Sequence, residues 1–261
     1  MTDKILSEKR GPVGALIFNN PARRNAVSLE MWEAVEAILH DFAKDPGVRV
    51  VVLSGAGGKA FVSGADISEF EKQRSTPETV AGYNRTSARA HEMLQNLDKP
   101  TIAMIRGWCM GGGVALALAC DLRVCSDDSK FGIPAARLGL GYRMPGIRRL
   151  ADVVGPSAAK EILLTARHYT ADEALRLGLV NRVVPAAELE AWVEAYAAQI
   201  AENAPLTIAA VKRIVAEIVK DPADRDLEVC ERLVEQCFAS QDYVEGRRAF
   251  MEKRKPSFTG R

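Results

Sequence analysis

Short apolar runs alternate with amphipathic stretches through the first two thirds of the chain. Val13–Phe18 is apolar and lies between turn-forming residues, which predicts a buried strand. From Ser28, apolar positions recur at helical spacing over residues 29–42, so we predict a helix with Ser28 as its cap. A valine-rich run over residues 48–53 predicts a second buried strand.

The same alternation continues toward the middle of the chain. Thr76 and Pro77 are typical of a helix start, and that helix is expected to end near Leu97. Thr101–Ile105 predicts a third strand, and residues 114–119 a helix. Strands that alternate with helices predict an α/β fold with right-handed crossover connections.

The pattern changes near residue 170. Thr170 and Glu173 have the spacing of a capping box, and after Pro185 the chain is almost entirely helical in pattern. The predicted helices cover residues 186–203, 206–220, 225–239 and 242–253. We therefore divide the chain into a core of residues 1–185 and a C-terminal helical region of residues 186–261, whose apolar stripes indicate contact with another subunit.

Composition and charge exclude several classes of protein. The chain has 261 residues, which suits one large domain, and 48% of them are hydrophobic, so wholesale disorder is not expected. The 35 basic and 34 acidic residues leave a net charge of +1, which argues against nucleic-acid binding but leaves room for a local cationic pocket.

Cysteine usage and hydropathy point to an intracellular setting. The five cysteines form an odd set without a C-x-x-C pair, so we expect reduced thiols, no disulfide framework and no metal site. The N-terminus lacks the apolar core of a signal peptide, and the apolar run over residues 107–120 is too short to span a membrane. We therefore expect a cytoplasmic protein without membrane contact.

Two glycine-containing turns are candidates for chemistry. The first covers residues 60–67, and the second, residues 107–113, joins the strand Thr101–Ile105 to the helix over 114–119. Glycine lets a ligand approach the backbone, and the N–H groups at a helix N-terminus favour an anion. A tight turn required only for packing explains the same glycines equally well.

These turns belong to a set of segments that resembles the crotonase superfamily, the enoyl-CoA hydratase/isomerase family. The segments are Phe61-Val-Ser-Gly-Ala-Asp-Ile67, Lys99-Pro-Thr-Ile-Ala103, Gly107-x-x-x-Gly-Gly-Gly113, Ala119-Cys-Asp-Leu122, Phe131-Gly-Ile-Pro134 and Glu245-Gly-Arg-Arg-Ala-Phe250. They occur in the family's order over nearly the whole chain.

The resemblance implies a fold, a substrate class and a mode of assembly. The fold would be a spiral of ββα repeats with a C-terminal helical trimerisation region, and the chain would self-associate as a trimer or hexamer. The substrate would be an acyl-CoA thioester, with no cofactor beyond the coenzyme A that the substrate carries. The N–H groups of Ala65 and Gly112 would form an oxyanion hole, in which losing one donor costs roughly 3–4 kcal/mol in a comparable case.

The resemblance also places the coenzyme A contacts. Arg23 and Arg24 lie in the loop over residues 20–26, where relatives contact the nucleotide, and would meet its phosphates; the alternative is that both are solvated loop charges. The remaining coenzyme A contacts would come from Ala26, Ala60, Val62, Ser63, Asp66 and Ile67. A structural alternative for Asp66 is that it caps the next helix.

The sequence departs from the family at two positions that carry its acid and base. Hydratases of the family have glutamate two residues after the third glycine and after the proline of Phe131-Gly-Ile-Pro134, and this chain has Ala115 and Ala135 there. General acid–base help is typically worth ~100- to 10,000-fold, and alanine moves no proton. Water addition by two glutamates is therefore expected to be severely impaired. Glu69 and His91 are weak candidates for replacement groups, because solvated side chains are the usual outcome on amphipathic helices.

Tyr142 and Arg143 support a different reaction. Their segment resembles that of family members that decarboxylate methylmalonyl-CoA, in which loss of carbon dioxide itself generates the enolate. Arg143 would recognise the carboxylate, and Tyr142 would orient it or protonate the product. The alternative is that Arg143 lies at the surface and Tyr142 only packs. Three interpretations stay open: a hydratase-like lyase that finds its proton groups elsewhere, a decarboxylase, and a non-catalytic acyl-CoA-binding subunit.

Overall fold

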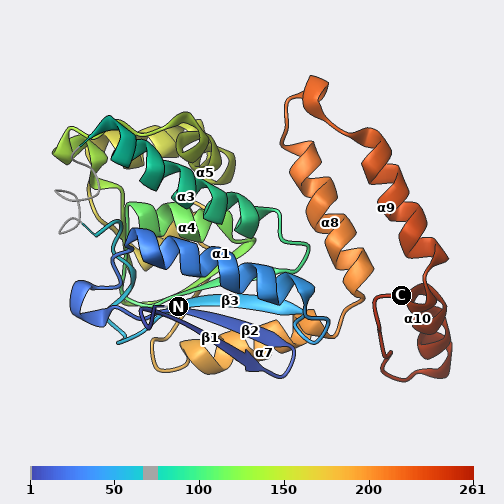
Figure 1. Cartoon of the computed structure of the whole chain (residues 1–261). Coiled ribbons are helices and arrows are strands. Elements are labelled where there is room, and N and C mark those ends of the chain that lie inside the picture. The colour runs from blue at the N-terminus through green and yellow to red at the C-terminus, as the bar shows by residue number, and fades with distance from the viewer. Residues whose placement is uncertain (1, 67–75) are drawn as a thin grey trace.

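Two β-sheets form the centre of the molecule in the computed structural model, which describes residues 2–66 and 76–261 (Figure 1). Ile67, a predicted coenzyme A contact, and Glu69 lie outside the described residues. The six-stranded sheet has the order β1 (Ile5–Arg10), β2 (Val13–Phe18), β3 (Val50–Gly55), β5 (Thr101–Ile105), β7 (Leu122–Ser126) and β10 (Arg182–Val184). The four-stranded sheet has the order β4 (Ala60–Val62), β6 (Trp108–Met110), β8 (Lys130–Gly132) and β9 (Tyr169–Thr170).

The strand order confirms the predicted α/β layering. β1 pairs antiparallel with β2, whereas the pairs from β2 through β3, β5 and β7 to β10 are all parallel. Parallel neighbours require a crossover between them. The crossovers have a common form, because β3 is followed by β4 and a helix, and β5 by β6 and a helix. Each ββα repeat thus adds one strand to each of the two sheets and one helix. Successive repeats form the predicted spiral.

The helices that the structure describes are α1 (Leu29–Lys44), α3 (Pro77–Gln95), α4 (Gly112–Ala119), α5 (Met144–Thr165, kinked at Gly155), α6 (Ala171–Arg176), α7 (Leu189–Ala201), α8 (Pro205–Ile218), α9 (Leu227–Ala239) and α10 (Gln241–Glu252). Thr76 and Thr170 each make a capping box, as their spacing indicates. Ser28 is the N-cap of α1, but its hydroxyl makes no capping hydrogen bond. The predicted strand over 48–53 begins and ends two residues later, as β3.

The central strands are buried on both faces. Along β3, Val51 and Leu53 belong to the main core cluster with α1, while Val50 and Val52 pack in a second cluster with α7. α1 therefore covers one face of the six-stranded sheet and α7 the other, and α3 packs against α1 (Figure 1). Burial on both faces explains why these strands are continuous apolar runs in the sequence.

Helices α8 to α10 extend away from the sheets, and we call residues 205–252 the C-terminal arm (Figure 1). Lys212 anchors the arm, since its Nζ donates to Asp121 Oδ2 at 2.8 Å and to Lys99 O at 3.1 Å. A groove of about 920 Å³ runs between the arm's helices. Its lining includes exposed apolar side chains, of which Phe250 is 83% exposed and Met251 80%. The helices predicted over 206–220, 225–239 and 242–253 are all present, with ends shifted by a few residues.

Candidate functional site

The Ala65 N–H group is available to a ligand. Ala65 follows β4 and forms a single parallel bridge with Val27. Val27 N–H donates to Gly64 O at 2.9 Å, and Asp66 N–H donates to Val27 O at 3.2 Å. Successive N–H groups point to opposite sides of an extended chain, so the N–H of Ala65 points away from Val27. It donates to no acceptor in the described part of the chain.

The Gly112 N–H group lies beside it. Gly112 opens α4, and the first N–H groups of a helix have no partner within it. A Cβ atom built on Gly112 would lie 3.8 Å from Ala65 N, which brings the backbones of the two turns into contact. Among the residues described, Gly112 N–H has no acceptor either. Two unpaired donors therefore lie side by side, at the positive end of a helix dipole.

Close packing of α4 on β4 holds this arrangement. A Cβ atom on Gly113 would lie 2.0 Å from Val62 O, so no larger residue fits at that position. Gly111 has φ 51°, a left-handed conformation that favours glycine. The sequence left two explanations for these glycines, a packing turn and a ligand-binding turn. Both agree with the structure, because the glycines permit tight packing and leave N–H groups without partners.

The structure gathers the described coenzyme A candidates around one strand end. Ser63 N–H donates to Arg24 O at 3.1 Å, and Ser63 Oγ donates to Arg23 O at 3.3 Å. The loop over residues 20–26 therefore docks on the end of β4. The side chains of Arg23 and Arg24 are exposed, whereas those of Ala26, Ala60 and Val62 are buried. The buried residues can offer a ligand only their backbone groups.

The Asn25 side chain holds this loop in place through hydrogen bonds. This role was not identified from the sequence. Its side chain is fully buried, and Nδ2 donates to Ala60 O at 2.8 Å and to Ala56 O at 3.0 Å. Its Oδ1 accepts from Asn20 N–H at 2.9 Å. Asn25 also has φ 57°, which asparagine tolerates better than most residues. In the sequence, an asparagine within a polar loop gives no sign of burial.

Ala115 and Ala135 are the residues that the resemblance places at the family's two glutamate positions. Ala115 stands three residues after Gly112 on α4 and is half-buried, so the two residues share one face of the helix. Ala135 is buried in the 3-10 helix Pro134–Leu138. Neither methyl group exchanges a proton.

Tyr142 and Arg143 face different surroundings. Tyr142 packs against the main core, and burial raises the pKa of its phenol. Arg143 is exposed and is the N-cap residue of α5, and it makes no ion pair with the residues described. The two residues are therefore adjacent in sequence but not in environment. Their roles in the acyl site stay predictions.

The sequence predicts a solvated side chain for His91, and this prediction is wrong for its ring. Its ring packs against Trp32 with centroids 4.9 Å apart, and its Nε2 is sealed from solvent. Burial lowers the pKa of His91 to about 4. The ring is therefore neutral at pH 7.

The buried thiols are unsuited to nucleophilic chemistry. All five cysteines are free, and Cys109, Cys120 and Cys125 are buried. Burial raises the pKa of each of these three, to about 12 for Cys120, so the reactive thiolate does not form at neutral pH. Within residues 2–66 and 76–261, no group of histidine, cysteine and carboxylate side chains is placed to hold a metal ion.

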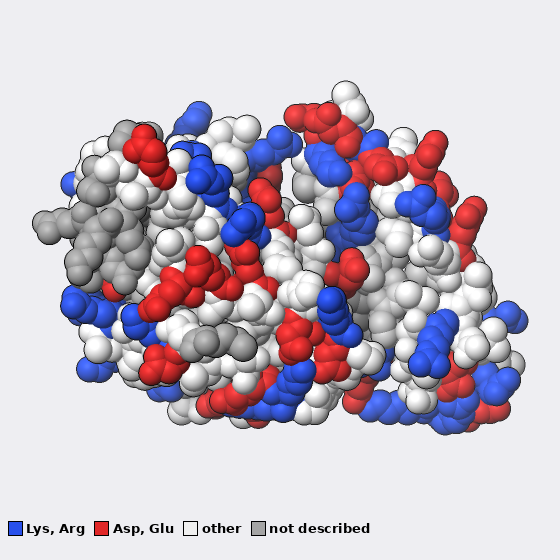
Figure 2. All heavy atoms as spheres, in the orientation of Figure 1, with Lys and Arg blue, Asp and Glu red and all other residues white. Residues whose placement is uncertain are grey.

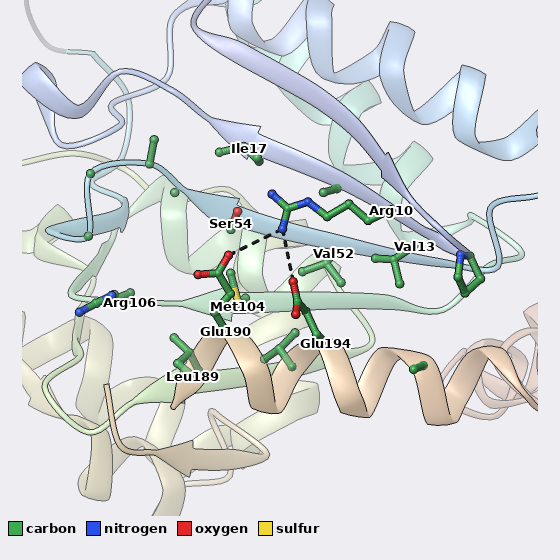
Figure 3. Close-up of a pocket in the computed structure, with 18 residues that line it drawn as sticks. Arg10, Val13, Ile17, Val52, Ser54, Met104, Arg106, Leu189, Glu190 and Glu194 are labelled. Atoms are coloured by element: carbon green, nitrogen blue, oxygen red, sulfur yellow. Dashed lines mark hydrogen bonds and ion pairs between the residues drawn. The ribbon is translucent and has the colours of Figure 1, made fainter. Parts of the chain in front are cut away.

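A hollow of about 560 Å³ lies on the α7 face of the six-stranded sheet (Figure 3). Arg10 reaches across it toward Glu190 and Glu194, with N–O distances of 3.7 and 3.5 Å, and also binds Glu8. The hollow contains none of the residues predicted for the acyl-CoA site. It is thus separate from the paired donors.

The visible surface carries no extended patch of one charge. Lysine and arginine side chains are interspersed with aspartate and glutamate over both the core and the C-terminal arm (Figure 2). In the described part of the chain, no helix is long and apolar enough to cross a bilayer.

Known proteins with this fold define the class of the chain. The family model described as "Enoyl-CoA hydratase/isomerase" matches residues 8–261, so the chain belongs to the enoyl-CoA hydratase/isomerase family. It is 36% identical to a crotonyl-CoA hydratase of Syntrophomonas wolfei, with 98% of each chain covered. It is 34% identical to a carnitinyl-CoA dehydratase of Proteus mirabilis, with 100% of each covered. A crystal structure of a family protein from Hyphomonas neptunium matches with a TM-score of 0.94 and 38% identity, over 99% of this chain and 98% of that one.

Proposed function

We propose that this protein is an acyl-CoA enzyme that stabilises a thioester enolate with the N–H groups of Ala65 and Gly112. The observation that carries the proposal is the pair of adjacent N–H groups without an acceptor in the described residues. A thioester carbonyl oxygen gains negative charge as the enolate forms, and preorganised donors stabilise that charge without reorganising. Family membership supports the same substrate class.

The reaction class that we favour is a hydratase-like lyase without the two-glutamate machinery. Relatives named as hydratases and dehydratases support the lyase class. The proton must come from groups other than residues 115 and 135, since both are alanine. We therefore expect slow hydration of crotonyl-CoA compared with relatives that carry both glutamates.

A decarboxylase of methylmalonyl-CoA-type thioesters is the second candidate. Loss of carbon dioxide needs no base, which suits a site with alanine at both glutamate positions. The phenol of Tyr142 carries its proton at neutral pH, and burial raises its pKa further above the ordinary value, so a proton is present at this position. A non-catalytic acyl-CoA-binding subunit is the remaining alternative, favoured only by the two alanines.

Binding and turnover assays on the same protein separate these candidates. Calorimetric titration with butyryl-CoA tests binding, and crotonyl-CoA and methylmalonyl-CoA are then assayed for hydration and for release of carbon dioxide. Binding with turnover of either substrate supports an enzyme and identifies its reaction. Binding without turnover of any acyl-CoA supports the non-catalytic alternative, and absence of binding contradicts the whole proposal.

We also propose that the C-terminal arm mediates self-association into trimers or hexamers. Exposed apolar side chains such as Phe250 and Met251 support this, because a folded chain seldom leaves so much apolar surface in water. The family resemblance implies the same assembly.

A further inference from the structure

The two proposed oxyanion donors differ in how the chain holds them. The Gly112 N–H group belongs to the first turn of α4, and the hydrogen bonds of that helix fix its direction. Ala65 lies beyond the end of β4 in no helix or strand, and its bridge to Val27 stands outside both sheets. Oxyanion donors are effective when their direction is set before the substrate binds, so Ala65 requires support from other parts of the chain.

One hydrogen bond sets the direction of the Ala65 N–H group. That N–H belongs to the same peptide group as the carbonyl of Gly64, and because the peptide is planar and trans the two point in opposite directions. Gly64 O accepts from Val27 N–H at 2.9 Å. The position of Val27 therefore fixes the direction in which the Ala65 N–H points. The same bond polarises the peptide group, which makes its N–H a stronger donor.

The carbonyl oxygen of Val27 is held by two donors. Asp66 N–H donates to it at 3.2 Å, and the hydroxyl of Tyr83 on α3 donates to it at 3.1 Å. One donor is enough to pair a buried carbonyl oxygen, so the hydroxyl is not required for that purpose. The second donor comes from a helix distant in sequence, and it restricts the movement of Val27 relative to α3.

Trp32 on α1 fixes the Tyr83 hydroxyl in turn. Its Nε1 donates to Tyr83 Oη at 3.0 Å, and because an indole N–H only donates, the phenol accepts there and keeps its own proton for Val27. Trp32, Tyr83 and Val27 are all buried, and α1 packs against α3 (Figure 1). Buried hydrogen bonds that are fully paired make a site rigid. The bonds thus run from α1 through α3 to the turn that carries Ala65.

We propose that Tyr83, held by Trp32, is a positioning residue that orients the Ala65 N–H group through Val27. The inference rests on the proposed function, because it concerns a donor to the thioester oxygen. Loss of the hydroxyl should weaken the polarisation of the thioester carbonyl and leave the coenzyme A contacts intact. An interaction that strengthens as charge develops on the oxygen affects kcat more than KM.

The carbonyl group of a bound thioester reports how the donors are directed. We would bind butyryl-CoA labelled with carbon-13 at its carbonyl and record the stretching band by isotope-edited infrared difference spectroscopy. Hydrogen bonds to the oxygen weaken the C=O bond, so wild type is expected to shift the band to a lower frequency than that of the free ligand. Tyr83→Phe removes only the hydroxyl and is expected to reduce this shift, while the dissociation constant stays close to that of wild type.

Turnover gives a second measurement. For whichever substrate wild type consumes, crotonyl-CoA or methylmalonyl-CoA, kcat is expected to fall about fivefold in Tyr83→Phe, the effect of one hydrogen bond, with KM nearly unchanged. Trp32→Phe should change the band and kcat in the same direction, and it keeps the test decisive if Tyr83→Phe fails to fold. Tyr196→Phe removes a phenol hydroxyl on α7, at the opposite face of the six-stranded sheet, and as the control should match wild type.

The infrared band separates a positioning role from a merely structural one. If Tyr83→Phe lowers the melting temperature but shifts the band as far as wild type does, the inference alone is overturned. If wild type binds butyryl-CoA without shifting the band, or does not bind it, the oxyanion hole of the proposed function is contradicted, and the inference with it.

Discussion

A methyl group added to Gly112 would lie 3.8 Å from the backbone nitrogen of Ala65, although α3, β5 and β6 lie between the two residues in sequence. The contact joins the end of β4 to the first turn of α4. It brings the backbone N–H groups of the two turns close together, as the proposed oxyanion hole requires.

Gly112→Ala tests this pair directly. The new methyl group would meet its nearest neighbours at 3.6 to 3.8 Å, which is ordinary contact, so we expect the variant to fold with an unchanged melting temperature. Both N–H groups remain, but the methyl group would lie 3.8 Å from Ala65 N and would crowd an oxygen held by the pair, so we expect acyl-CoA turnover to fall by about 100-fold or more, as when one oxyanion donor is lost.

Gly113→Ala is the matched control, because its methyl group would lie 2.0 Å from Val62 O. We expect it to lower the melting temperature strongly, since α4 must move away from β4. Turnover that is equal in wild type and Gly112→Ala would contradict the role of these donors.

The double substitution of Ala115→Glu with Ala135→Glu should create ordinary hydratase activity. Ala115 shares a helical face with Gly112, so a carboxylate there would stand beside the oxyanion donors. We expect crotonyl-CoA hydration to rise by ~100-fold or more over wild type, measured by loss of enoyl absorbance. Each single variant is the control, and a rate in wild type that matches two-glutamate relatives would show that the alanines are not the limiting feature.

His91 should make the protein less stable in mild acid. Its folded pKa of about 4 lies below the ordinary value of 6.5, so at higher pH the ring is neutral in both folded and unfolded states. As pH falls from 6.5 to 4, the unfolded chain gains a proton that the folded chain does not bind, and up to about 3 kcal/mol of unfolding free energy is lost.

Urea denaturation across this pH range measures the effect in wild type and in His91→Leu. The variant should lack this component of the pH dependence, whereas His40→Leu should keep it. Parallel curves for wild type and His91→Leu would mean that the pKa of His91 does not change on folding.

Phe250→Asp should weaken self-association through the C-terminal arm. Its side chain is 83% exposed, and a charge there would be buried without a partner if another subunit covered it. We expect sedimentation velocity to show a smaller species for Phe250→Asp than for wild type. Gln236→Asp introduces the same charge at another exposed position of the arm and should leave the assembly intact. If wild type, Phe250→Asp and Gln236→Asp form assemblies of the same size, the surface around Phe250 is not the subunit interface.

Much of the fold follows from local pattern. Val13–Phe18 and Thr101–Ile105 have the predicted limits, because a strand buried on both faces is a continuous apolar run that ends at turns. The capping boxes at Thr76 and Thr170 depend only on residues three apart. The strands β4, β6 and β8 have three residues each, too few for a periodicity, so the second sheet could not be predicted from pattern alone.

The sequence by itself determined the α/β alternation and the motifs of the family, and it predicts that Ala115 and Ala135 stand where the family has two glutamates. Only the tertiary structure decided that the backbones of Ala65 and Gly112 meet, and that buried nitrogens of His91 and Arg149 have no hydrogen-bond partner among the described residues. The physical reason is the sequence distance over which the interactions act. Strand and helix patterns depend on neighbours a few residues apart, whereas burial and hydrogen-bond partners depend on how distant elements pack against each other.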